Sequence, residues 1–344
     1  MKLKKTFEYR NVWMGLAILW IVWFHSGIVL PSTILTFIKS IGYGGVDIFL
    51  FASGIGCYYS LGNNSDTIEF LKRRFVRIIP IYWCFLIVWV VYKVIFRDMP
   101  LVAILGNVFC IQNLTGRGNE FNWYMSVMVL TYLLAPLFYR IINRLSSWKQ
   151  YITVLILLIA LSVPFWQNNI AIIVMTRIPI FFLGMVIAKL AKQECVITKK
   201  GWVVTASTAL CGVVVLIWCF KKYEAYLWSY GLYWYPFLLI VPGACLIVSF
   251  FLEQLQKNLL GRAIVRFFGF FGKFSFEIYL IHVFVLDIFG THFFATGIFP
   301  DRIRYRLFAL ACVVPGCVFL RLYYKGVMKT VSYIQDKFEK KKER

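Results

Sequence analysis

The sequence predicts an all-α integral membrane protein with about ten transmembrane helices, one short re-entrant helix and both termini in the cytoplasm. Three observations support this fold class. Hydrophobic residues make up 61% of the 344 residues and charged residues 15%, whereas soluble globular domains have about 45–50% and 25%. Apolar runs of membrane-spanning length recur along the whole chain. Lys and Arg gather in the loops of one side.

Ten apolar runs are long enough to cross a hydrocarbon core of ~30 Å at ~1.5 Å per residue. The predicted spans are 12–30, 41–60, 78–96, 122–140, 151–167, 170–188, 203–220, 230–252, 274–290 and 307–324. A further run, 101–114, covers only about 20 Å, so we expect a re-entrant or partial span there. No repeat or linker divides the chain, so we expect a single domain over residues 1–344.

The positions of Lys and Arg orient these spans. With the N-terminus in the cytoplasm, 27 of the 37 basic residues fall in cytoplasmic segments, including a basic tail at 325–344. If 101–114 crossed fully, this asymmetry would largely vanish. The tail is expected to lie against anionic lipid headgroups. The net charge of +22 is therefore explained by orientation, and we expect no nucleic-acid partner because no basic stretch forms a separate binding domain.

A few ionisable side chains lie at membrane depth, where such groups are costly and commonly functional. These side chains are His25, Asp47, Arg177, Glu277, His282 and Asp287. The nine cysteines form no C-x-x-C pair, so no metal site is expected.

His25 lies about 20 Å along the first span, where a neutral imidazole suits a general base. A packing histidine is the alternative, for His25 and for His282. Glu277 and Asp287 each lie five residues from His282, about 500° of helix rotation, so neither acid is expected to pair with it.

Three further charged features each have more than one interpretation. Asp47 follows a glycine cluster, where it can cap a helix, pair with an arginine or orient a histidine. Arg74 and Arg77 are three residues apart on one helix face, which suits a phosphate grip as well as simple orientation. Arg177 lies within a span, where it can snorkel to the interface, pair with a carboxylate or bind an anionic substrate.

Six segments together resemble the membrane-bound acyltransferase 3 family, in the family's order. The first is the opening apolar helix that ends in His25. The others are GYGGVDIFLFASGIGCYYSL, FLKRRFVRIIPIYW, NWYMSVMVLTYLLAPLFYRI, TRIPIFFLGMVIAKL and GKFSFEIYLIHVFVL.

The resemblance implies an acyl-CoA-dependent O-acyltransferase in a bacterial inner or plasma membrane, acting on sugar hydroxyls of envelope polysaccharides or lipid-linked glycans. His25 matches the catalytic base, and Arg74 and Arg77 match the pair that holds coenzyme A. Asp47 matches the acid of the second-span motif, and His282 belongs to the last motif, with an expected catalytic role.

The motifs also imply substrate contacts from Trp123, Arg177 and Tyr279. One position departs from the family, which usually carries Arg or Lys eleven residues before the histidine. This chain has Met14 there, and Arg10, one helical turn earlier, is expected to bind the donor instead.

Acetyl-CoA is the expected donor, with succinyl-CoA as the alternative, and both direct transfer and an acyl-histidine intermediate fit the residues. Two other functions fit a polytopic protein with intramembrane ionisable groups. One is a proton-coupled transporter or exporter of a small metabolite or glycan, although no two-fold repeat is visible. The other is an accessory membrane subunit, which would not require the Arg and His pattern.

Overall fold

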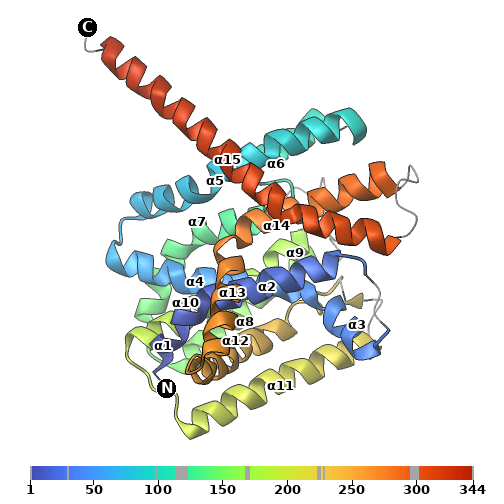
Figure 1. Cartoon of the computed structure of the whole chain (residues 1–344). Helices are drawn as coiled ribbons and strands as arrows, with labels where there is room; N and C mark the ends of the chain where they lie inside the picture. Colours follow the sequence, from blue (N-terminus) through green and yellow to red (C-terminus); the bar gives the residue numbers. More distant parts are fainter. Residues whose placement is uncertain are drawn as a thin grey trace.

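The computed structural model describes residues 2–28, 31–97, 99–113, 123–166, 171–222, 226–227, 229–294 and 302–342. Within these residues the regular elements are helices, and the one β-type contact is an isolated bridge between Lys2 and Val196. The predicted all-α class is confirmed. Figure 1 shows the helices in one assembly, with the C-terminal part of the last helix extending beyond the others.

The helices of the first half are α1 (Leu3–Thr6), η1 (Phe7–Tyr9), α2 (Arg10–His25), α3 (Thr33–Ser40), η2 (Gly42–Gly44), α4 (Gly45–Asn63), α5 (Thr67–Arg97), α6 (Leu101–Val108), α7 (Trp123–Arg144) and α8 (Trp148–Ala160). Those of the second half are η3 (Val163–Phe165), α9 (Ala171–Met175), α10 (Ile178–Lys192), α11 (Lys199–Lys222), α12 (Pro236–Leu255), α13 (Leu259–Lys273), α14 (Ser275–Ile288), η5 (Phe289–Phe294) and α15 (Arg302–Lys342).

Eight helical segments among the described residues are long and apolar enough to cross a membrane, or nine if the bent α13–α14 pair counts as one span. The predicted multi-pass architecture is therefore confirmed. Helix α2 has 16 residues, about 24 Å, which is shorter than the 18 residues required of a membrane-spanning helix in this count. The predicted total of ten spans, and the cytoplasmic placement of both ends, stay predictions.

Several spans differ in detail from their predicted limits. The predicted span 170–188 is broken between α9 and α10, where Arg177 precedes the new helix and Pro179 occupies its first turn. Proline is tolerated there because the first N–H groups of a helix have no internal acceptor. For the same reason α12 begins at Pro236, six residues after the start of the predicted span 230–252.

Helix α13 occupies a segment that the sequence placed outside the spans. It begins at Asn258, whose side chain accepts a hydrogen bond from the Gly261 N–H, and it is bent by 69° from the following helical segment. It crosses α2 at Gly272, where a side chain would overlap the backbone of Asn11. Hydropathy alone misses this helix because Arg262 and Arg266 interrupt its apolar residues.

Helix α4 forms the centre of the protein and packs on α2, α7 and α10. The tightest contact is with α10, where Gly54 meets the backbone of Phe181 and Gly184 meets the backbone of Phe51. Small residues that let helices approach this closely are typical of membrane helix interfaces. By contrast, α8 and α11 expose large apolar side chains along most of their length, including Leu157, as expected for lipid-facing helices.

The α4–α10 contact generates a stability prediction. Replacing a helical glycine by alanine ordinarily favours a helix by about 1 kcal/mol. Gly184→Ala should instead destabilise the protein by about 1–3 kcal/mol, because the new Cβ would lie 3.0 Å from the carbonyl carbon of Phe51. The midpoint of thermal unfolding in detergent measures the effect.

Gly269→Ala is the matched control, because nothing lies within 4 Å of a Cβ at that helical glycine. Equal melting midpoints for the two variants would show that α4 and α10 do not pack as described.

Candidate active site

Two cavities lie along the same three helices, α2, α14 and α15. The first, which we call the arginine cavity, has a volume of about 370 Å³ and is lined by Arg10 of α2, Glu277 of α14 and Arg321 of α15, among others. The second, the histidine cavity, has a volume of about 270 Å³ and is lined by His25 at the other end of α2. Because Arg10 and His25 are 15 residues apart, the two cavities lie about 22 Å apart along the helix.

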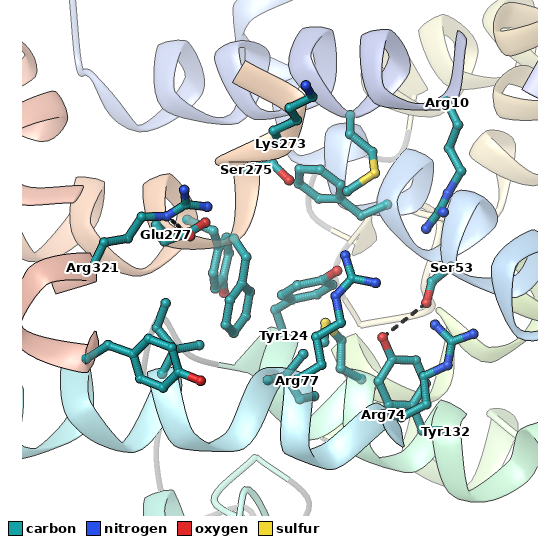
Figure 2. Close-up of a pocket in the computed structure, with 18 of the residues that line it drawn as sticks. Arg10, Ser53, Arg74, Arg77, Tyr124, Tyr132, Lys273, Ser275, Glu277 and Arg321 are labelled. Atoms are coloured by element: carbon teal, nitrogen blue, oxygen red, sulfur yellow. Dashed lines mark hydrogen bonds and ion pairs between the residues drawn. The ribbon is translucent and has the colours of Figure 1, made fainter. Parts of the chain in front are cut away.

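Several basic side chains line the arginine cavity, together with aromatic and aliphatic ones (Figure 2). Its cationic lining residues are Arg10, Arg74, Arg77, Lys273, Arg321 and Lys325. One carboxylate, Glu277, lies among the lining residues. The sequence predicted three of these cations as a donor site, and the structure brings all three together from α2 and α5.

Arg10 and Arg74 meet over Gly56 of α4. The Arg74 guanidinium donates a 2.8 Å hydrogen bond to the Gly56 carbonyl, and the Arg10 guanidinium lies against the Gly56 Cα position. The ring of Tyr132 lies 5.8 Å from the Arg74 guanidinium carbon. Arg10 Nε is buried and has no hydrogen-bond partner among the described residues. The two guanidiniums are thus held side by side, with donor capacity left for an anion.

Met14, the position at which the family resemblance led us to expect a basic residue, also lines the arginine cavity. Arg10, one turn earlier, reaches the same space with its longer side chain. The geometry therefore supports the expectation that Arg10 supplies the positive charge that Met14 cannot.

The sequence analysis did not assign Lys273, Arg321 and Lys325 to a site. Arg321 Nε donates a 2.6 Å hydrogen bond to Glu277, and its guanidinium carbon lies 3.9 Å from the centre of the Phe274 ring. One feature of the sequence could have indicated these residues. Glu277, an acid early in α14, needs a cationic partner, and Arg321 and Lys325 lie one turn apart on α15. The sequence analysis attributed Lys273, Arg321 and Lys325 to the positive-inside bias that orients the spans.

The histidines of the first and last motifs come together although 257 residues separate them. His282 Nε2 lies 3.1 Å from His25 Nδ1. His282 is fully buried on α14, whereas His25, the last residue of α2, opens into the histidine cavity. The two rings therefore join α2 to α14 next to that cavity.

Backbone carbonyls fix which ring nitrogens carry protons when both imidazoles are neutral. His282 Nδ1 lies 2.9 Å from the Ile278 carbonyl, and His25 Nδ1 lies 3.1 Å from the Ile21 carbonyl. A carbonyl only accepts, so both Nδ1 atoms must be protonated. His282 Nε2 is then an acceptor for His25 Nδ1–H, and no described residue uses the lone pair of His25 Nε2.

Aromatic side chains lead from the arginine cavity to this pair. Tyr124 and Tyr279 line the cavity and their ring centres are 4.9 Å apart. The Tyr279 ring centre is 5.9 Å from that of His282. The predicted substrate residue Tyr279 thus lies between the arginines and the histidines.

Asp47 and Arg177 form a separate buried cluster. Arg177 Nε lies 3.4 Å from an Asp47 carboxylate oxygen, and both side chains are almost completely buried. The indole rings of Trp123 and Trp234 lie 5.1 and 4.9 Å from the guanidinium carbon. None of these four residues is among the lining residues of either cavity. The cluster joins α4 to α7, α10 and the residues before α12.

The structure places these predicted site residues against one another and outside the lining of both cavities, and their expected roles stay predictions. Asp47 was expected to act in catalysis, and Trp123 and Arg177 to contact substrate. Their mutual contacts instead suit a structural role, since a buried arginine needs a carboxylate and aromatic faces for compensation. No group of three or more His, Cys, Asp or Glu able to hold a metal occurs in the described ranges.

These features define a helical, multi-pass membrane protein with a cation-lined cavity and a histidine pair. The profile of the acyltransferase 3 family, described as an acyltransferase domain, matches residues 11–322. The chain belongs to this family and is a membrane acyltransferase. No curated protein and no solved structure matched the chain.

The buried cluster yields a test of what Asp47 does. Asp47→Asn removes the charge that compensates Arg177, and breaking a buried ion pair in this way commonly costs about 3–5 kcal/mol. We expect Asp47→Asn to melt at a lower temperature in detergent than the wild type. Adding Arg177→Met should recover part of this loss, because it removes the uncompensated buried charge. An Asp47→Asn protein that melts like the wild type but has lost activity would show that Asp47 serves catalysis instead.

Proposed function

We propose that the protein transfers an acetyl group from cytoplasmic acetyl-CoA to a hydroxyl of an envelope polysaccharide or lipid-linked glycan, with His25 as general base. The observation that carries this proposal is the position of His25. It lies beside one cavity, while the same helix begins in a second cavity lined by six cations.

The arginine cavity fits the phosphates of coenzyme A. Guanidinium groups bind phosphate oxygens through paired, charge-assisted hydrogen bonds. Arg74 is hydrogen-bonded to the Gly56 carbonyl, the Arg10 guanidinium lies beside the same glycine, and Arg77 lies one helical turn from Arg74. We assign the donor's phosphates to these three arginines, with Lys273 and Lys325 on the opposite wall.

The positive-inside distribution supports a cytoplasmic mouth for this cavity. Arg74, Arg77, Lys273 and Lys325 all belong to segments that the charge bias assigns to the cytoplasm, the compartment that supplies acetyl-CoA. The histidine cavity, at the other end of α2, α14 and α15, would then open toward the outside of a bacterial inner or plasma membrane.

His25 Nε2 suits proton abstraction because its lone pair is free while Nδ1–H is held by Ile21 and His282. In the proposed step, Nε2 takes the proton of the acceptor hydroxyl as its oxygen attacks the thioester carbonyl. The new C–O ester bond forms, the C–S bond breaks, and the proton passes to the departing thiolate. General-base catalysis of this kind contributes about 10²–10⁴-fold.

His282 acts as a positioning residue in this scheme. Its Nε2 accepts from His25 Nδ1–H, which holds the His25 ring in one tautomer and one orientation. Because His282 is fully buried and bonded to the Ile278 carbonyl, it provides a fixed support.

Removing the proposed base tests the central residue. His25→Ala should lower acetyl transfer by at least about 100-fold while the protein still inserts and purifies as a folded species. CoA release and product mass, measured after reconstitution into lipid vesicles, report the rate. His292→Ala, which removes a histidine outside both cavities, should retain activity; comparable turnover by His25→Ala would refute the base assignment.

Removing two arginines tests the donor site. Arg74→Ala combined with Arg77→Ala should raise the KM for acetyl-CoA by at least about tenfold, since a hydrogen bond to a charged group contributes about 1.5–3 kcal/mol. The matched control is Arg73→Ala on the same helix, because Arg73 is exposed and pairs with Glu69. An unchanged donor KM in the double variant would exclude the phosphate site.

A further inference from the structure

We propose that the histidine cavity is the acceptor subsite and that Arg306 makes it selective for hydroxyl-bearing acceptors that also carry a phosphate or carboxylate. This inference rests on the proposed function, because it assumes that His25 is the base. The end of α2, the turn that follows it, α14 and α15 form the cavity. Its lining residues are His25, Ser26, Gly27, Val283, Leu286, Asp287, Tyr305 and Arg306.

Positive charge around this cavity is unexpected from orientation alone. Only ten of the 37 Lys and Arg lie outside the predicted cytoplasmic segments, and the positive-inside bias disfavours them on the outer side. Four of these ten lie in or near the histidine cavity, namely Lys39, Lys93, Arg97 and Arg306. Arg97 and Lys93 lie 3.3 and 3.8 Å from Asp287, and Lys39 lies near enough to Arg306 for their charges to interact. Within the described residues, Asp287 is the one carboxylate of the cavity lining and already has Arg97 and Lys93 as partners, so Arg306 adds a further positive charge there.

Arg306 is held directly beside the base. Its Nη1 donates a hydrogen bond to the carbonyl of Gly27, two residues after His25, and its Nε donates to the Tyr305 hydroxyl at 3.1 Å. The guanidinium also lies 5.6 Å from the centre of the Tyr305 ring. This charge is therefore fixed within the cavity that contains His25.

Gly27 makes this arrangement possible in two ways. Its φ of +65° ends α2 in the left-handed conformation that glycine adopts without strain. A Cβ there would also lie 2.6 Å from the Arg306 guanidinium carbon, so any side chain would displace the arginine. The turn after His25 is thus shaped to receive a guanidinium.

The chemistry of the lining identifies the ligand class. A fixed guanidinium binds phosphate or carboxylate oxygens in preference to neutral groups, while Tyr305 and Asp287 offer hydrogen bonds to hydroxyls. With a volume of about 270 Å³, the cavity is smaller than the ~300–1,000 Å³ of drug-sized sites. We therefore expect one sugar unit with an adjacent anionic group to enter it, its hydroxyl facing His25 Nε2.

Charged thiol reagents can measure the potential in the cavity without knowledge of the acceptor. Val283→Cys places a thiol in its wall, and the protein is studied in nanodiscs of neutral phosphatidylcholine so that no anionic lipid competes. An anionic methanethiosulfonate should modify Cys at this position at least about tenfold faster than a cationic one, since a cleft of one sign enriches counter-ions 10–10³-fold. Peptide mass spectrometry separates this label from native cysteines such as Cys211.

Adding Arg306→Gln should abolish that preference, whereas Arg304→Gln, an exposed position outside the cavity lining, should preserve it. In the same assay N-acetylglucosamine 1-phosphate should slow the labelling, and N-acetylglucosamine at equal concentration should not. Equal labelling by both reagents, equal protection by both sugars, or an unchanged preference in Arg306→Gln would overturn the proposal.

A binding measurement separates this proposal from the proposed function. Arg306→Gln should bind coenzyme A with wild-type affinity, because Arg306 lies outside the arginine cavity. Coenzyme A affinity that is lost in Arg306→Gln would overturn the acceptor assignment. Loss of coenzyme A binding only in the Arg74→Ala and Arg77→Ala variant would support the donor site independently.

Discussion

The hydrogen bond between His25 and His282 is the interaction on which the rest of the arrangement depends. Each ring is also bonded to a backbone carbonyl one turn earlier in its own helix, so the pair fixes the rotation of α2 and α14 relative to each other. With that rotation set, Arg10 and Glu277 face one cavity, and His25 and Asp287 face the other. The free lone pair of His25 Nε2 is a consequence of the same contact.

Two kinds of close packing support this pair. Gly272 lets α13 cross the start of α2. Gly54 and Gly184 let α4 and α10 approach each other closely. In the centre, α4 presents the Gly56 carbonyl that anchors Arg74, and one end of the same helix presents Asp47 to Arg177. Helix α4 therefore links the arginine cavity to the buried ion pair.

Much of the fold and part of the site could be predicted from the sequence. Hydropathy located most spans. The motifs singled out His25 and His282, which the structure brings into contact, and Arg74 and Arg77, which line the arginine cavity with Arg10. The sequence could not show that Asp47 pairs with Arg177, because the partner of a buried charge depends on packing between distant helices. Helix α13 and the cations of α15 were missed for another reason: their charges resemble the orienting charges of a loop.

The central claim is that the donor binds in the arginine cavity with its thioester end at the histidine pair. A structure of the protein with bound coenzyme A tests it most directly. The account predicts phosphates in contact with Arg10, Arg74 and Arg77, and the sulfur within hydrogen-bond reach of His25, about 2.6–3.2 Å or through one water, as proton transfer by a positioned base requires. Phosphates bound elsewhere, or a sulfur directed away from His25, would contradict it.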